Sequence, residues 1–494
     1  MSTEMFNPGR FWTRFPPTYR SQEMKILAEW IMAGESGTVV SLSGAGRATL
    51  LGYLCRRPDV LQTYLRPTDR QVVLVPVDLI NLPHYDLATL YRAILRSFYE
   101  IQQRFERTTQ TRIRDWYRRT EAAQDPFLPQ SALRELLIYF QGQETSIGLV
   151  INRFDRFCES ATLQMINTLR GLRDSFKETL FYIVSLPQEV VYLSHLESIA
   201  PLRHILDTNV CWVDALNADD ARQMIQYRTR HLARSINAQT MHQLVDYIVA
   251  ITGGFPAFIR VACDWWLSVG NQASEVDWVD TLLQKQNMRH RLRELWNGLT
   301  QEDQVVLSEL ARHQIRYEPG IEGEAEAQSA VQKKGMQQFE QQYTVLLPRL
   351  AARGVCRYSR FGWRINGHLL TAYAAANVGQ SRGKIWVDAV TGAVFQGSKL
   401  LANLPPIGRS VLQFLTEHPH TRHTHTALIE AAWPDDVLKA GVTTEALYQA
   451  IRNIRKEIEP DPASPLYIIN WRGQPEGGYQ FFPEGRPVTH QYQP

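Results

Sequence analysis

The stretch that most constrains the fold runs from Thr38 to Leu51 and reads TVVSLSGAGRATLL. Its β-branched start favours a short strand, its two glycines, Gly44 and Gly46, favour a tight turn, and its end favours a helix. A helix that begins directly after a turn points its free amide groups and its positive dipole end into that turn. The sequence therefore predicts a strand, a glycine turn and a helix that together can surround an anion.

The turn resembles the phosphate-binding loop (P-loop) pattern G-x-x-x-x-G-K-[ST], with three replacements. Ser41 stands at the first glycine, Arg47 at the lysine and Ala48 at the hydroxyl position. An arginine can still contact a phosphate, although its planar fork is not equivalent to a lysine. Ala48 cannot hold Mg²⁺, and Thr49 points about 100° further around the helix. We therefore expect a phosphate cradle without its metal ligand.

A chain of 494 residues is too long for one core, so about three domains are expected. Its apolar content of 44% is ordinary for a soluble globular protein, and its net charge of +3 means that any DNA contact must come from a local patch. The five cysteines lie far apart, which favours free thiols in a reducing cytoplasm. No signal-peptide pattern and no apolar run of about 20 residues is present. We expect a cytoplasmic protein without a membrane partner.

Strands and helices alternate over residues 1–215. The expected strands are residues 38–42, 71–78, 147–155 with a polar end, 180–185 and 210–213. The expected helices are residues 21–33, with Ser21 as N-cap, 87–107, 111–123 and 131–141. Continuous apolar strands separated by helices predict a doubly wound α/β domain with a five-stranded parallel sheet.

The ends of two strands carry unusual residues for a nucleotide-hydrolysing site. At the polar end of the strand that begins at Ile147, a P-loop protein carries acidic residues that order Mg²⁺ and polarise water, but here Asn152 and Arg153 occupy those positions. Neither can act as a general base at ordinary pH. Asp155, two residues further on, is an uncertain substitute. Ser185 ends the next strand, where it is either a γ-phosphate sensor or an ordinary strand-end serine.

An acidic helix and a glycine turn follow the sheet. Asn217 is a natural N-cap before acidic residues, and Gly253, Gly254 and Pro256 form a G-G-x-P turn. Over about residues 15–295 this order resembles the STAND and archaeal-type branch of the AAA+-related P-loop ATPases. The resemblance implies a core at 1–215, a helical lid at 216–298, and ATP or ADP as ligand. The expected nucleotide-binding residues are Gly44, Gly46, Arg47, Thr49, Asn152, Ser185 and Pro256.

The replacements in these motifs argue against efficient hydrolysis and against a Mg²⁺ requirement. The alternative is that the glycine loop is only a tight strand-to-helix turn.

Residues 299–376 predict a second, smaller module. Thr300 and Asp303 have the spacing of a capping box, and a further apolar helical pattern covers residues 339–350. Two short strands at 355–358 and 363–365 complete the order of a winged helix. In STAND-like proteins such a module usually serves as a spacer or regulatory contact, which we favour over DNA binding.

A small, polar linker at 377–384 precedes the last module, whose third long helix starts at Thr443 or Thr444. On a helical wheel its apolar stripe is Leu447, Ile451, Ile454 and Ile458. The opposite side carries Glu445, Gln449, Arg452 and Lys456. Such a face suits a major groove, where Gln449 can pair with adenine and Arg452 with guanine. The neighbouring Asn453, Arg455 and Lys456 can reach phosphates. The alternative is that this face is merely solvated.

The residues around this helix resemble the OmpR/PhoB-type winged helix over about residues 384–484. The matching segments are LIEAAW at 428–433, ALYQAIRNIRK at 446–456 and PLYIINWRG at 465–473. The resemblance makes residues 444–458 the recognition helix and residues 467–482 the wing of a domain at 385–486. Four residues, QPEG, lengthen the wing between Gly473 and Gly478. The expected DNA-binding residues are Thr444, Tyr448, Gln449, Arg452, Asn453, Arg455, Lys456 and Arg472.

Together these features favour a cytoplasmic transcriptional regulator: a P-loop domain and lid that control a winged helix binding double-stranded DNA. A homo-oligomer would link several weak sites. The first alternative is an active STAND-like ATPase, acting as a switch or remodeller and using its winged helices for protein contacts. The second is a scaffold without DNA binding. The scattered histidines are interpreted as surface residues, so no metal site is expected.

Overall fold

The computed structural model describes residues 9–66, 71–193, 197–230, 237–270, 277–316, 336–337, 339–359, 362–376, 385–387, 392–396, 399–459, 462–473, 476–483 and 485. The chain forms two compact units, Met1–Gly298 with Ala352–Val355, and Leu299–Ala351 with Cys356–Pro494. Among the described residues, no helix combines the length and the hydropathy that crossing a bilayer requires.

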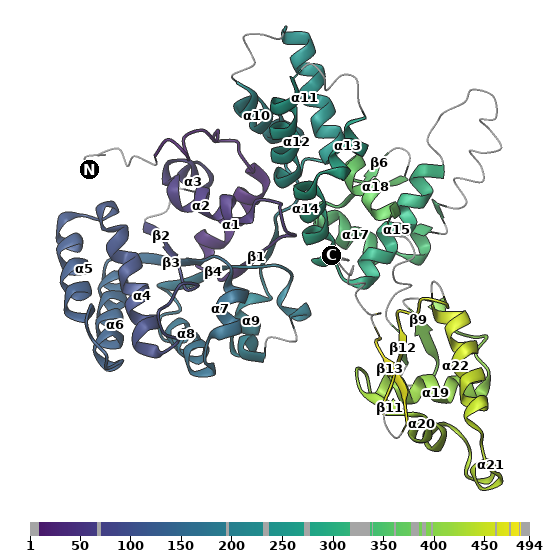
Figure 1. Ribbon diagram of the computed structural model, residues 1–494. Coiled ribbons are helices and arrows are strands. Elements are labelled where there is room, and N and C mark those ends of the chain that lie inside the picture. The colour runs from purple at the N-terminus through teal and green to yellow at the C-terminus, as the bar shows by residue number, and fades with distance from the viewer. Residues whose placement is uncertain are drawn as a thin grey trace. The chain divides into compact units, whose positions relative to one another are not determined.

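A five-stranded parallel sheet forms the centre of the first unit (Figure 1). Its strands are β1 (Gly37–Val40), β2 (Gln71–Val77), β3 (Thr145–Ile151), β4 (Leu180–Leu186) and β5 (Val210–Trp212). The spatial order is β2-β3-β4-β1-β5, and Val39 of β1 lies between Ser185 and Cys211 of its neighbours. Strands β3 and β4 are buried throughout, which explains their mostly apolar sequence. The predicted five-stranded sheet is confirmed.

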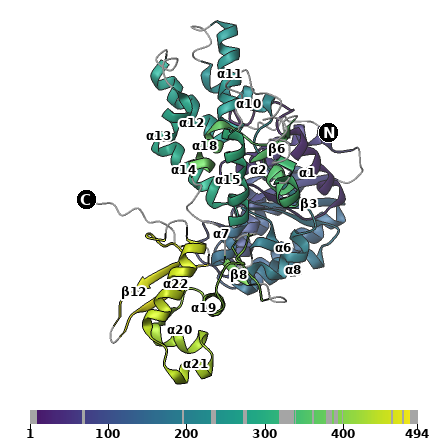
Figure 2. The same ribbon diagram turned by 90° about the vertical axis from the view of Figure 1, so that its right-hand side faces the viewer.

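Helices cover both faces of this sheet. The first group is α1 (Ser21–Ala33), α2 (Arg47–Arg56) and α3 (Pro58–Tyr64). The second group, on the opposite face, is α4 (Leu87–Glu100), α6 (Phe127–Gly142) and α8 (Leu163–Ser175) (Figure 1). Figure 2 shows α6 and α8 on the other side of the sheet from α1 and α2. Helix α5 (Arg107–Thr120) packs against α4 and α6 rather than against the sheet. The short helices are α7 (Phe154–Ser160), α9 (Arg203–Leu206) and 3₁₀ turns at Gln102–Arg104, Val190–Tyr192 and Glu197–Leu202.

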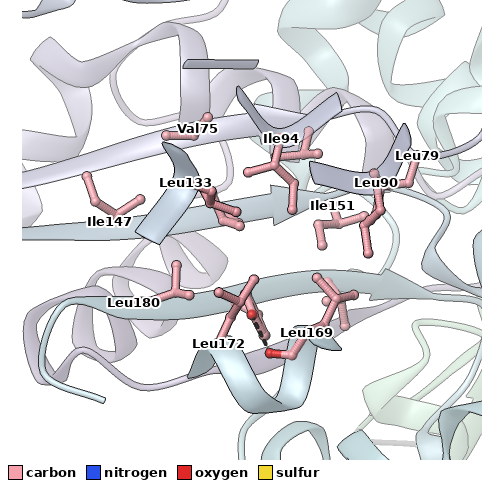
Figure 3. Packing of buried hydrophobic residues seen from close by; sticks show 14 of the residues in the cluster. Val75, Leu79, Leu90, Ile94, Leu133, Ile147, Ile151, Leu169, Leu172 and Leu180 are labelled. Atoms are coloured by element: carbon pink, nitrogen blue, oxygen red, sulfur yellow. Dashed lines mark hydrogen bonds between the residues drawn. The ribbon is translucent and has the colours of Figure 1, made fainter. Parts of the chain in front are cut away.

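The core on the second face is apolar and closely packed (Figure 3). Ile94 of α4 and Leu133 of α6 lie on one side of Ile151 in β3, and Leu169 and Leu172 of α8 pack beneath β4. These five side chains are at most 3% exposed. Burying each contributes up to about 1.5–3 kcal/mol, so this layer fixes where the strand ends lie.

Some expected helix boundaries are wrong. The helix expected over 87–107 ends at Glu100, and α5 begins at Arg107 instead of residue 111. Helix α6 begins at Phe127 instead of residue 131, although residues 126 and 129 are prolines. Pro129 is tolerated because it lies in the first turn, where its missing N–H has no helical partner.

Within the described part of the first unit, five helices follow the sheet. They are α10 (Ala218–Thr229), α11 (Ala238–Thr252), α12 (Pro256–Val269), α13 (Trp278–Gln284) and α14 (Gln286–Asn297). Asn217 caps α10 as expected, because its side-chain oxygen accepts a hydrogen bond from the Asp220 amide (2.9 Å). The proposed division between core and lid at residue 216 stays a prediction.

The second unit begins with the module at 299–376. It contains α15 (Gln301–Arg316), α17 (Leu346–Ala352), β6 (Cys356–Ser359), β7 (Gly362–Ile365) and α18 (His368–Ala376). The capping box forms, since the Asp303 amide donates to Thr300 Oγ1 (3.2 Å) and the Thr300 amide donates to Asp303 Oδ2 (3.1 Å). A turn at 343–345 interrupts the helix expected over 339–350. The helices and hairpin follow the order expected of a winged helix.

The C-terminal module is a winged helix, as predicted; the linker at 377–384 lies outside the described residues. Its helices are α19 (Pro406–Glu417), α20 (His425–Ala432), α21 (Asp435–Ala440) and α22 (Thr444–Ile458). Its strands are β8 (Ile385–Val387), β9 (Val394–Gln396), β10 (Lys399–Leu400), β11 (Arg422–Thr424), β12 (Ile468–Trp471) and β13 (Gly478–Phe481). They form antiparallel sheets ordered β10-β9-β8 and β11-β13-β12, the second of which contains the wing hairpin β12–β13.

Candidate nucleic-acid interface and phosphate loop

Helix α22 has one fixed face and one open face. Leu447, Ile451, Ile454 and Ile458 are at most 2% exposed and pack into the domain core. The outward side chains of Tyr448, Gln449, Arg452 and Lys456 are exposed. The core therefore orients the predicted contact residues toward solvent.

The outward residues differ in how they are held. Gln449 Nε2 donates to Asn453 Oδ1 (3.2 Å), which aligns the two amides along the helix. The rings of Tyr448 and His425 make a T-shaped contact, with centroids 5.3 Å apart. Arg452 and Lys456 have no carboxylate within ion-pair distance among the described residues. These two cations are therefore available to an external anion.

Thr444 and Arg472 lie at the edges of this surface. Thr444 is the first residue of α22 and is half-buried, and the N-cap is Thr443, whose side chain makes no capping bond. Arg472 is exposed directly after β12, where the wing loop begins.

Arg455 has a different environment from the phosphate contact that we expected. Its Nη2 donates to the Ile468 carbonyl and to Asn470 Oδ1, both at 2.6 Å. Its guanidinium carbon also lies 5.7 Å from the Tyr479 ring centroid, and burial lowers its pKa. Arg455 thus connects the recognition helix to the wing.

A second connection between helix and wing comes from Glu459, which sequence reasoning missed. This residue is 1% exposed, and its carboxylate accepts hydrogen bonds from the backbone amides of Leu466 (2.6 Å), Tyr467 (2.9 Å) and Ile468 (2.9 Å). The only signal was an acidic residue just beyond a helix end, where the dipole disfavours it.

The wing is also tied to α20. Glu476 accepts hydrogen bonds from the amide (3.0 Å) and the hydroxyl (2.9 Å) of Thr426, and these bonds lower its pKa. At Gly478 a Cβ atom would stand 1.8 Å from the His423 carbonyl oxygen, so strands β11 and β13 can pair only if this residue is glycine. The wing therefore has a defined position beside α22.

In the first unit, the glycine turn follows β1 at the switch point of the sheet, where doubly wound folds bind ligands. Gly44 and Gly46 have φ of 89° and 97°, in the left-handed region that favours glycine. The G-G-x-P turn lies directly on this loop: the Ala257 amide donates to the Gly44 carbonyl (3.2 Å). Pro256 Cγ would be 3.5 Å from a Cβ at Gly46. The expected neighbourhood of Pro256 and the loop is therefore present.

An arginine that sequence reasoning missed fills part of this neighbourhood. Arg20 is 1% exposed, and its Nη2 donates to the carbonyls of Ala45 (2.5 Å) and Asp214 (3.0 Å). The same guanidinium pairs with Glu23, and the Arg20 amide donates to Asp220 Oδ2 (3.0 Å). The prediction of Ser21 as N-cap is wrong, because Arg20 occupies the cap with φ of 51°. Arg20 thus joins α1, the glycine loop and the start of α10.

The residues expected to hold phosphate and metal bind one another. Arg47 donates to the Leu186 carbonyl, and burial lowers its pKa to about 10, which leaves it cationic at neutral pH. Ser185 Oγ donates to Asn152 Oδ1 (2.8 Å) and accepts from the Arg153 amide (2.8 Å).

Thr49 and Asp155 are the two further residues that could contribute to a Mg²⁺ site. Thr49 is half-buried on α2. Burial raises the pKa of Asp155, the nearest acidic substitute. The donor set therefore does not fit a Mg²⁺–nucleotide complex: Ala48 has no hydroxyl, and the side-chain oxygen of Asn152 already accepts a bond.

Comparison with known proteins identifies the last module. Residues 400–481 match the family described as "Transcriptional regulatory protein, C terminal". The winged helix at the C-terminus is therefore of the OmpR/PhoB type. No curated protein matches the chain in sequence.

Solved structures resemble the chain only loosely. A Walker-type ATPase of Pyrococcus abyssi has 12% identity and a TM-score of 0.38, over 72% of this chain and 95% of that chain. The ORC2 protein of Aeropyrum pernix, in ADPNP and ADP complexes, has 14% identity and a TM-score of 0.36, over 72% and 94%. Cdc6p from Pyrobaculum aerophilum has 13% identity and a TM-score of 0.34, over 76% of this chain and 96% of that chain. The P-loop fold of the first unit rests on its own strand order and glycine loop.

Proposed function

We propose that the chain is a transcription regulator whose helix α22 enters the major groove of double-stranded DNA. The observation that carries this proposal is the outward row of Gln449, Arg452 and Lys456 on a helix fixed by its buried isoleucines and braced by a wing. The family match of residues 400–481 supports the same interpretation.

Each outward residue has a role in the proposal. Gln449, aligned by Asn453, and Arg452 contact base edges, for which an amide suits adenine and a guanidinium suits guanine. Lys456 and Arg472 contact phosphates on either side of the groove. Thr444 and Tyr448, nearer the helix start, complete the surface. Arg455 has no role in DNA contact, because its guanidinium would first have to leave two carbonyl-type oxygens.

The test is a titration of the full-length protein with labelled duplexes. A sequence selected from a random 30-base-pair pool is compared with mixed-sequence duplex. Arg452→Ala should weaken binding to the selected duplex by about 1–3 kcal/mol, or roughly 5- to 150-fold, and leave mixed-sequence binding nearly unchanged. Lys456→Ala should weaken both alike. Glu430→Gln, an exposed change on α20, is the control. Unchanged affinity in both variants would favour the scaffold alternative.

For the first unit we propose nucleotide sensing without hydrolysis, as in a STAND-like switch. The left-handed glycine turn and the start of α2 support contact with ATP or ADP. Nucleotide would compete with the bonds from Arg47 to Leu186 and from Arg20 to Ala45, so we expect weak affinity. A titration with labelled ATP and ADP, beside a Mg²⁺-dependent turnover assay, tests this. Turnover above a protein-free blank would revive the active-ATPase alternative.

We further propose that the protein acts in the cytoplasm and as an oligomer. Five buried free thiols suit a reducing compartment. A single winged helix with nearly balanced charge binds modestly, and linked copies multiply that affinity. Light scattering with and without the selected duplex tests the oligomer: a monomer mass in both states would contradict it.

A further inference from the structure

Helix α5 carries an unusual concentration of positive charge. Its sequence, RTTQTRIRDWYRRT, contains one acidic residue, Asp115. Its five arginines are all exposed, namely Arg107, Arg112, Arg114, Arg118 and Arg119. The opposite side of the helix is buried, with Ile113 and Trp116 packed in the core. The helix therefore shows a cationic face to solvent while its apolar face is already used.

These arginines lack the acidic partners that some other exposed arginines of the first unit have. Elsewhere in the described unit, Arg96 pairs with Glu100 (2.9 Å) and Arg170 with Asp174 (3.4 Å). No carboxylate among the described residues lies within ion-pair distance of the five arginines on α5. Arg114 donates to Gln102 Oε1 (3.2 Å), and Arg112 lies over the Tyr139 ring (4.8 Å). The charge of α5 is thus left for an external anion.

The helix holds these charges on a rigid support. Trp116 Nε1 donates to Glu135 of α6 (3.0 Å), and Tyr117 stacks on Tyr99 of α4 with centroids 4.6 Å apart. At 100° per residue, Arg107, Arg114 and Arg118 fall within an arc of about 40°, and Arg107 to Arg118 spans about 16 Å. That length corresponds to roughly five base pairs of duplex.

We propose that α5 is a second DNA-contacting surface, which binds backbone phosphates without reading sequence. The choice of DNA as the anion rests on the function proposed for α22. Guanidinium groups bind phosphate oxygens through two parallel hydrogen bonds, which suits a row of arginines. A membrane surface fits less well, because an interfacial helix inserts an apolar face and that of α5 is buried. A weak second contact on a tethered unit adds to the affinity of the first.

The test measures the salt dependence of duplex binding by the full-length protein. In the test variant, Arg114, Arg118 and Arg119 are changed together to glutamine. The matched control changes Arg156, Arg170 and Arg291, which are paired with acidic residues elsewhere. The slope of log K against log salt falls by about 0.9 for each phosphate that the protein no longer neutralises, so the test variant should lower it by up to about 2.7. The preference for the selected duplex and the circular dichroism spectrum should not change.

A second background separates this proposal from the function proposed for α22. In Arg452→Ala/Lys456→Ala protein, residual binding to mixed-sequence duplex should fall further when the α5 changes are added. That result supports α5 even if α22 does not read DNA. Equal slopes and affinities for the α5 variant and its control overturn the proposal and leave α22 untouched. Absence of any duplex binding at low salt by the unaltered protein overturns both proposals. Both are also overturned if the unaltered protein binds anionic lipid vesicles or an acidic protein instead of duplex DNA.

Discussion

Glu459 offers the sharpest test of how the recognition helix is held to the wing. Its buried carboxylate receives the three consecutive amides of Leu466, Tyr467 and Ile468. In Glu459→Ala these amides lose their acceptor while they stay inside the domain. Each hydrogen bond to a charged group contributes about 1.5–3 kcal/mol, and relaxation makes the sum less than additive. We expect the local free energy of opening to fall by about 3–6 kcal/mol, a large part of a typical domain's stability.

Hydrogen exchange of the full-length protein measures this quantity locally, which matters because a chain of several domains has no single unfolding free energy. Peptides that cover residues 462–483 should exchange about two to four orders of magnitude faster in Glu459→Ala, and peptides from the first unit should not change. Glu459→Gln, which keeps one acceptor oxygen, should fall between. The exposed Glu430→Gln is the control. Exchange of the wing amides at the unaltered rate in Glu459→Ala would refute the reasoning.

Three further predictions concern the first unit and the thiols. Arg20→Ala leaves Glu23 buried without its partner, so it should cost about 3–5 kcal/mol and lower the thermal midpoint of that unit by about 2–4 °C per kcal/mol, whereas Arg20→Lys should lose less. Burial, and to a smaller extent the neighbouring Glu23 carboxylate, raises the pKa of Asp214 to about 6 from 3.8. Between these two pKa values the folded state binds more protons than the unfolded state, so the free energy of unfolding should fall as pH rises from about 4 to 6. Because this side chain is 49% exposed, the effect should stay below about 1 kcal/mol and vanish in Asp214→Asn. Burial raises the pKa of all five thiols to about 12 from 9.0, so a thiol reagent at pH 8 should label them about 1,000-fold slower than in unfolded protein.

The sequence predicted the parts of the fold that depend on local pattern. Helix α22 over Thr444–Ile458 has the bounds that the winged-helix resemblance implied, and its apolar stripe is buried as the helical wheel predicted. Strands β3 and β4 were found because a continuous apolar run can only be buried on both faces. These signals reside in neighbouring residues, so one sequence suffices to read them.

The contacts that hold the candidate sites together could not be predicted in the same way. Arg20 reaches the carbonyl of Asp214, 194 residues away, and Arg47 reaches that of Leu186, 139 residues away. Which carbonyl faces a buried guanidinium depends on how the strands are ordered, and no local pattern encodes that order. A polar residue at a strand end therefore indicates a site, but it does not indicate whether a ligand or another part of the chain forms its hydrogen bonds.

The position of Arg455 on the helical wheel distinguishes side chains that face solvent from side chains that hold the wing. The apolar stripe and the outward row lie on opposite sides of the helix. We take the direction opposite the middle of the apolar stripe as the outward centre, and Gln449 and Lys456 fall within about 10° of it. Arg455 lies about 110° from that centre, beside the apolar stripe, where a long side chain extends along the domain surface instead of into solvent. There it meets the carbonyl and amide oxygens of the wing. Angular position on the helix, and not charge alone, therefore distinguishes the arginine that can reach a base pair, Arg452, from the one that positions the wing.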